Sequence, residues 1–162
     1  MDATELTRGK LIAAACGIAL FAVMFFSWFD TSTVGGTDFS AAAYAAGVDT
    51  TIDAWQAFAF IDVILLLTVL AAVGAVVLSL VSRSPAPVAP EAVVFGLAVL
   101  SSLLVLYRIF NPVLDGGRKL GLFLGFLAAA GIAAGGWLAM QETAAASRSR
   151  RRPVAPPRSS PF

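Results

Sequence analysis

The 162-residue chain is 59% hydrophobic and only 13% charged, with a formal net charge of +1, whereas a soluble domain is typically about 25% charged. It contains no histidine and a single cysteine, Cys16, which excludes an internal disulfide, a Cys/His zinc site, histidine-ligated haem and Ser-His or Cys-His nucleophile pairs. The apolar residues are gathered in four runs between polar breaks, which indicates a small membrane domain with several spans.

The first apolar run, residues 11–29, has no charged residue and follows a short polar segment that ends in Arg8 and Lys10. A signal peptide has a similar order, but its apolar region is usually about 7–15 residues long and a small-residue cleavage site follows it. The sequence Ser27-Trp28-Phe29-Asp30 provides no such site. We therefore expect an uncleaved transmembrane helix, with Thr4 or Thr7 as its N-cap and its aromatic end at the membrane–water interface.

The loop that follows, residues 30–54, carries four aspartates and no lysine or arginine. Its pattern predicts a turn at residues 33–37 and a short helix at residues 39–46. Thr50 and Asp53 have the spacing of a capping box, so the next helix is expected to begin near residue 52. We expect the aspartates to cap turns and helices. A divalent-cation site is the alternative, although the spacing of a calcium loop is absent.

The second run, residues 55–81, contains one carboxylate, Asp62, in an otherwise uncharged stretch. An ionisable group at membrane depth costs roughly 2.5–3.5 kcal/mol on insertion scales, so a partner is expected. Arg108, near the end of the third run, residues 92–110, is the candidate. We expect a cross-helix ion pair that fixes the helix register. The alternative is that Asp62 binds a proton or cation in a site gated by Arg108.

The fourth run, residues 120–140, is rich in glycine. The pairs Gly121-x-x-x-Gly125 and Gly131-x-x-x-Gly135 let helix backbones approach closely, which matters because lipid gives no hydrophobic drive for helix association. We expect these glycines to pack helices within one bundle, and homodimerisation is the alternative.

Residues 141–162 are rich in Arg, Ser and Pro, which predicts a disordered tail. Its basic residues Arg148, Arg150, Arg151 and Arg152 are expected to contact anionic lipid headgroups, at about 1 kcal/mol for each. The prolines that follow also resemble a polyproline ligand, which is the weaker alternative.

The distribution of basic residues predicts the orientation. If both termini and the proline-rich connector after residue 81 are cytoplasmic, that side holds most of the Lys and Arg residues, and the other side holds Arg108, Arg118 and Lys119. This arrangement obeys the positive-inside rule and needs an even number of spans.

Three short motifs resemble a group of small four-span bacterial membrane proteins. They are Ser27-Trp28-Phe29-Asp30, Ala54-Trp55-x-Ala57-Phe58 followed by Asp62, and Tyr107-Arg108-Ile109-Phe110-Asn111-Pro112. The resemblance covers about residues 11–140. It implies a four-span fold in a bacterial inner membrane and no particular activity.

We therefore expect an all-α integral membrane protein, a four-helix antiparallel bundle (residues 1–140) with a disordered basic tail. It is expected in the plasma membrane with both termini cytoplasmic. The expected partners are the bilayer, anionic headgroups and a homodimer or larger membrane complex; no nucleic acid, cofactor, metal ion or catalytic residue is expected. The predicted function is a non-enzymatic structural, accessory or interaction role. The alternative is a small proton- or cation-coupled transporter or channel that uses Asp62.

Overall fold

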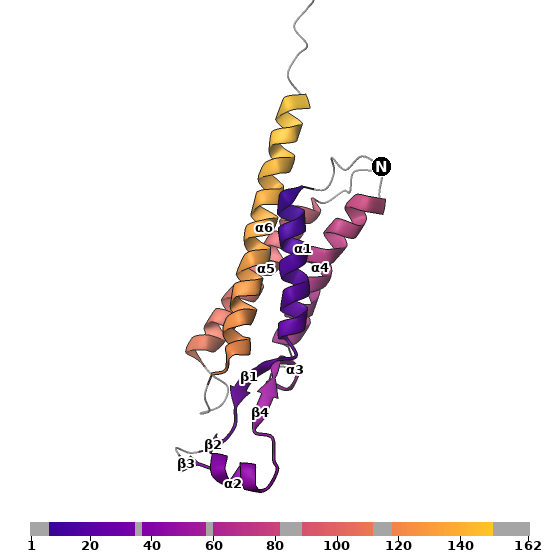
Figure 1. Cartoon of the computed structure of the whole chain (residues 1–162). Helices are drawn as coiled ribbons and strands as arrows, with labels where there is room; N and C mark the ends of the chain where they lie inside the picture. The colour runs from indigo at the N-terminus through magenta and orange to yellow at the C-terminus, as the bar shows by residue number, and fades with distance from the viewer. Residues whose placement is uncertain (1–6, 35–36, 58–59, 82–88, 112–117, 151–162) are drawn as a thin grey trace, which may run out of the picture.

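The computed structural model describes residues 7–34, 37–57, 60–81, 89–111 and 118–150, and most of them are helical (Figure 1). The four longest helices in this part of the chain are α1 (Arg8–Val23), α4 (Ile61–Val81), α5 (Pro90–Phe110) and α6 (Leu120–Arg150). Helix α1 packs against α4 and α6, and α5 packs against the same two helices. The four helices therefore form a closed ring of contacts.

Neighbouring helices of this ring run antiparallel. Lys10 of α1 contacts Ser79 near the end of α4, and Gly17, two turns later in α1, faces Ala72. Figure 1 shows the same alternation for all four helices. The short connections from α4 to α5 and from α5 to α6 agree with antiparallel neighbours in an up-and-down bundle.

Three helices of the described residues are long and apolar enough to cross a membrane: α4, α5 and α6. These helices indicate a multi-pass membrane protein. Helix α1 has 16 residues, or about 24 Å at 1.5 Å per residue, which is less than the roughly 30 Å of a hydrocarbon core. By length, three of the four predicted spans are therefore found.

The first predicted span, residues 11–29, is too long at its C-terminal end, whereas its predicted N-cap is confirmed as Thr7. Helix α1 begins at Arg8, where the Thr7 side chain caps it by accepting the N–H of Lys10 at 3.4 Å. It ends at Val23, and the next residues form strand β1 (Ser27–Asp30), which pairs antiparallel with β4 (Thr51–Asp53). Trp28 is fully buried. Phe29 is also fully buried, whereas Phe25 and Phe26 are exposed. Of the aromatic end that was predicted at the membrane–water interface, Trp28 and Phe29 therefore lie inside the end of the bundle.

The predicted start of the second span is also wrong. Residues 51–53 form β4, the single-turn helix α3 (Ala54–Ala57) follows, and α4 begins only at Ile61. The capping box is replaced by a turn around Asp49, whose Oδ1 accepts both the N–H (2.9 Å) and the hydroxyl (2.8 Å) of Thr51. This turn leads the chain into a strand, so no helix starts there.

Two small two-stranded sheets qualify the all-α prediction. Besides the β1–β4 pair, β2 (Thr33–Val34) pairs antiparallel with β3 (Thr37–Asp38). The predicted short helix is confirmed as α2 (Ser40–Ala45), which is followed by Gly47 at φ 66°. These short elements gather at one end of the bundle (Figure 1), which we call the Asp30 end. The opposite end is called the Lys10 end.

Helix α6 corrects the predicted disorder of residues 141–162 in its first part. The helix continues to Arg150, because Gln141, Glu142 and the alanines that follow are good helix formers. Its last turns extend past the other helices (Figure 1). Residues 151–162, including Arg151 and Arg152, lie outside the described residues.

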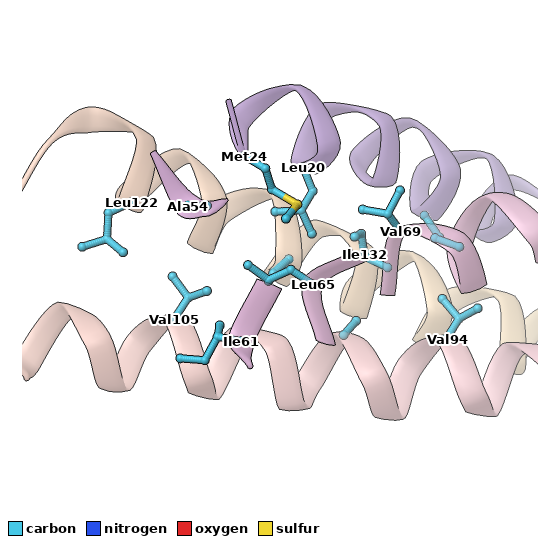
Figure 2. Packing of buried hydrophobic residues seen from close by; sticks show 14 of the residues in the cluster. Leu20, Met24, Ala54, Ile61, Leu65, Val69, Val94, Val105, Leu122 and Ile132 are labelled. Carbon is cyan, nitrogen blue, oxygen red and sulfur yellow. The ribbon is translucent and has the colours of Figure 1, made fainter. Parts of the chain in front are cut away.

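The core is built from inward-facing apolar side chains of all four long helices. Leu20, Leu65, Val105 and Leu122 come one from each helix and are fully buried. Figure 2 shows them meeting in one cluster with Met24, Ile61 and Ile132. Most of the long apolar side chains outside this cluster point away from the bundle, as expected where lipid surrounds the helices.

Candidate functional site

Asp62 lies in the first turn of α4 and is only 4% exposed. Its Oδ1 atom has no hydrogen-bond partner in the part of the chain that the structure describes. Among the described residues the salt bridges link Lys10 to Glu91 and Lys119 to Asp30, and none is seen between Asp62 and Arg108. A second carboxylate, Asp53, lies on β4, although its spacing from Thr50 predicts a helix start there.

Two buried hydroxyl groups, one on α4 and one on α5, are in hydrogen-bond contact and show which residues of the two helices lie at the same depth. Thr68 Oγ1 and Ser101 Oγ are 2.7 Å apart, and both side chains are fully buried. Asp62 lies six residues before Thr68, and Arg108 lies seven residues after Ser101. At 1.5 Å per residue, the two charged residues lie at nearly the same depth, about 9–10 Å from the hydroxyl pair. The contact between Thr68 and Ser101 joins α4 to α5 at this level, and a role of the predicted ion pair in the helix register stays a prediction.

The Lys10 end contains a buried ion pair that the sequence analysis missed. Lys10 Nζ lies 3.1 Å from Glu91 Oε1 and donates to Ser79 Oγ at 2.9 Å. The side chains of Lys10 and Glu91 are only 12% and 7% exposed. Three helices therefore meet at one ammonium group. Glu142 Oε2 adds α6 by accepting the N–H of Gly9 at 3.2 Å.

A sequence signal for this pair was present. Lys10 and Glu91 carry opposite charges at the beginnings of the first and third apolar runs. In an antiparallel bundle these two helices begin at the same end. A carboxylate in the first turn of a helix is also favoured by the helix dipole, so Glu91 alone did not call for a partner.

The four predicted packing glycines all make close contacts inside the chain. A Cβ atom on Gly121 or Gly125 would come within 2.8 Å of the Trp28 side chain. A Cβ atom on Gly131 would lie 2.6 Å from Cys16 Sγ, and one on Gly135 would lie 2.6 Å from the backbone N of Ala13. Both small-residue motifs are therefore occupied by β1 and α1 of the same chain.

At the Asp30 end, the aspartates hold turns. Asp30, Asp38 and Asp49 each accept the N–H of the residue two positions later, at 2.8–2.9 Å. Hydrogen bonds from Lys119, which lies 2.8 Å away, and from the Ser32 N–H hold the pKa of Asp30 well below its usual range. The N–H groups of Ser40 and Thr51 lower the pKa values of Asp38 and Asp49. Within the described residues, no three acidic, histidine or cysteine side chains form a group that would hold a metal ion.

Of the four arginines predicted to contact lipid, one has a described side chain. Arg148 is exposed on the last part of α6, where it lines a hollow. The side chain of Arg150 lies outside the described part. Comparison of the chain with protein-family models, curated proteins and solved structures found no match.

Proposed function

We propose that the protein is an integral membrane protein with a structural or accessory role and no enzymatic activity. In this proposal α1 crosses the bilayer as a fourth, shorter span, and both termini are cytoplasmic. The Lys10 end is then the cytoplasmic end, where the Lys and Arg excess of the sequence satisfies the positive-inside rule.

The junction of Lys10, Ser79 and Glu91 carries the proposal. A buried charge in a transporter is expected to face a substrate path, whereas Lys10 uses its ammonium group to join α1, α4 and α5. The junction lies beside closely packed small residues, including Ala13, Ala75 and Ala139. The arrangement holds helices together, as a structural role requires.

Breaking this junction tests the proposal. Removing one partner of a buried ion pair costs about 3–5 kcal/mol, because the other charge stays buried without compensation. We expect Lys10→Met or Glu91→Gln to lower the free energy of unfolding in mild detergent by about 3 kcal/mol, and the double variant to lose less than the sum. Arg8→Gln is the matched control, because Arg8 is exposed in the same turn of α1 and is expected to stay within about 0.5 kcal/mol.

Asp62 favours a second candidate, a small proton- or cation-coupled transporter. Its Oδ1 is buried without a hydrogen-bond partner in the described residues, and such acids inside membranes often mark ion paths. Flux measured in proteoliposomes separates the two. The structural role predicts proton and cation flux equal to that of protein-free liposomes. Flux that Asp62→Asn abolishes, in a variant that still inserts, would replace the structural proposal by this one.

A further inference from the structure

The last part of α6, from Trp137 onward, carries a hollow of about 480 Å³ along its side. The residues that line it are Trp137, Met140, Gln141, Ala144, Ala145 and Arg148. The spacing of residues 137, 141, 144 and 148 places them along one face of the helix. Trp137 is half exposed, and both Gln141 and Arg148 are exposed.

The position of this face follows from its contact with α5. The rings of Trp137 and Phe95 are 5.5 Å apart, and Gly136 lies against the backbone of Phe95. Helix α5 begins five residues before Phe95, so its first residue is level with about Glu142. Beyond that level, α6 extends past the other described helices (Figure 1). The residues that line the hollow all belong to α6, so the hollow lies along the side of this helix, from the level of the first turns of α5 into its extended part.

The chemistry of the hollow changes along the helix. Trp137 and Met140 form its apolar part beside the bundle, and Arg148 forms its cationic part about 16 Å further along the axis. Tryptophan favours the level of the membrane–water interface. A guanidinium group binds phosphate oxygens with two parallel hydrogen bonds. An amphipathic ligand with an anionic phosphate head fits this order.

We propose that the hollow binds one anionic phospholipid, with its acyl chains against Trp137 and Met140 and its phosphate at Arg148. The inference rests on the membrane placement in the proposed function and adds a defined lipid site to it. The side chains of Gln141 and Arg148 select the headgroup, and the apolar residues hold the chains.

Fluorescence quenching by brominated lipids tests this site. The full chain is reconstituted in phosphatidylcholine vesicles that contain a fixed fraction of brominated phosphatidylglycerol or, in the comparison, brominated phosphatidylcholine. We expect brominated phosphatidylglycerol to quench more strongly, with an apparent preference of about fivefold, the factor expected for one basic residue at an anionic surface. Trp137→Phe should remove the excess quenching, since Trp28 is buried and Trp55 lies at the opposite end.

Two further variants test whether the preference for phosphatidylglycerol depends on Arg148. Arg148→Gln should reduce the preference to near unity, whereas Arg8→Gln, an exposed arginine on α1 at the same end, should leave it unchanged. Equal quenching by both lipids, or a preference that survives Arg148→Gln, would overturn the lipid site. Flotation of the protein with the vesicles is measured in the same samples. Protein that does not float with them would instead overturn the membrane placement in the proposed function.

Discussion

Asp30 is a single carboxylate that joins three parts of the fold. It lies on β1, accepts the N–H of Ser32 at 2.9 Å and forms a salt bridge with Lys119 at 2.8 Å. The N–H of Lys119 also donates to the carbonyl of Trp28 at 3.0 Å. The salt bridge and the backbone hydrogen bond of Lys119 therefore hold the beginning of α6 against β1.

The pKa of Asp30 gives this contact a pH dependence. Because Lys119 and Ser32 hold the folded-state pKa below the ordinary value of 3.8, the carboxylate stabilises the fold fully above about pH 3.8. This contribution is lost as the pH falls through the lower folded-state value. We expect Asp30→Asn, whose side-chain carbonyl still accepts the Ser32 N–H, to lose up to about 1 kcal/mol at neutral pH. The loss is small because Lys119 is 41% exposed.

Unfolding of the two proteins in mild detergent across the acidic range checks this prediction. The difference should shrink towards zero as the pH falls below about 3.8, because Asp30 is protonated first in the unfolded parent chain and then, at the lower folded-state pKa, in the folded protein. Asp38 and Asp49 also have lowered pKa values, but they are present in both proteins and cancel in the difference. A difference that is independent of pH would show that the Lys119 contact contributes nothing.

The sequence predicted single residues well where the signal was local. Thr7 caps α1 as one of the two predicted residues, and α2 lies within the predicted residues 39–46. Pairs that meet only through the fold were harder to predict. Lys10 and Glu91 are far apart in the chain, and the partner of Asp62 was chosen by depth alone. Asp62 and Arg108 do lie at nearly the same depth. The direction of each side chain, however, is decided by packing, which residue spacing does not reveal.

At the scale of elements, the contact between α1 and α6 depends on small residues. Gly9 and Ala13 lie directly on Gly135 and Ala139, so the two helix backbones approach closely. This crossing uses the second glycine motif of α6. The motif was readable in the sequence, and its spacing predicted close helix packing. The spacing did not say which helix would be the partner.

Substitution of Gly135 tests the closeness of this crossing. In Gly135→Ala the new methyl group would lie 2.6–2.9 Å from backbone atoms of Gly9 and Ala13, so α1 must move away. Overpacking of this kind typically costs about 1–3 kcal/mol. Gly74→Ala is the matched control, because no atom lies within 4 Å of its added methyl group and alanine is the better helix former. Thermal unfolding in detergent should show a lower unfolding temperature for Gly135→Ala only. Equal effects of the two substitutions would contradict the predicted overpacking.

Strand β1 shows why hydropathy overestimated the first span. Aromatic residues at the end of an apolar run fit a lipid interface, but they also fit the inside of a bundle. Trp28 lies inside the bundle, because Gly121 and Gly125 leave space for its ring and its Nε1 donates to the carbonyl of Val23 at 2.9 Å. Two glycines that lie more than ninety residues later therefore decide where the helix ends.

At the scale of the whole molecule, α1 decides the number of spans. Helices α4, α5 and α6 are each long enough to cross a bilayer, and three spans alone would leave the two ends of the chain on opposite sides. Helix α1 covers about 24 Å by its 16 residues, yet it runs beside the other helices in the bundle (Figure 1). A thinned bilayer beside α1 accommodates a short helix at a modest cost. The proposed topology therefore counts it as a span.

Labelling of single cysteines decides between three and four spans. In a Cys16→Ala background, cysteine replaces Arg8, Tyr44 or Ser147, each of which is exposed. Four spans with cytoplasmic termini predict that a membrane-impermeant maleimide labels Tyr44→Cys on intact cells. Arg8→Cys and Ser147→Cys should be labelled only after the membrane is permeabilised. If Arg8→Cys and Tyr44→Cys are both labelled on intact cells, α1 does not cross the membrane. The helices joined by the Lys10–Glu91 pair would then have to pack together without α1 as a span.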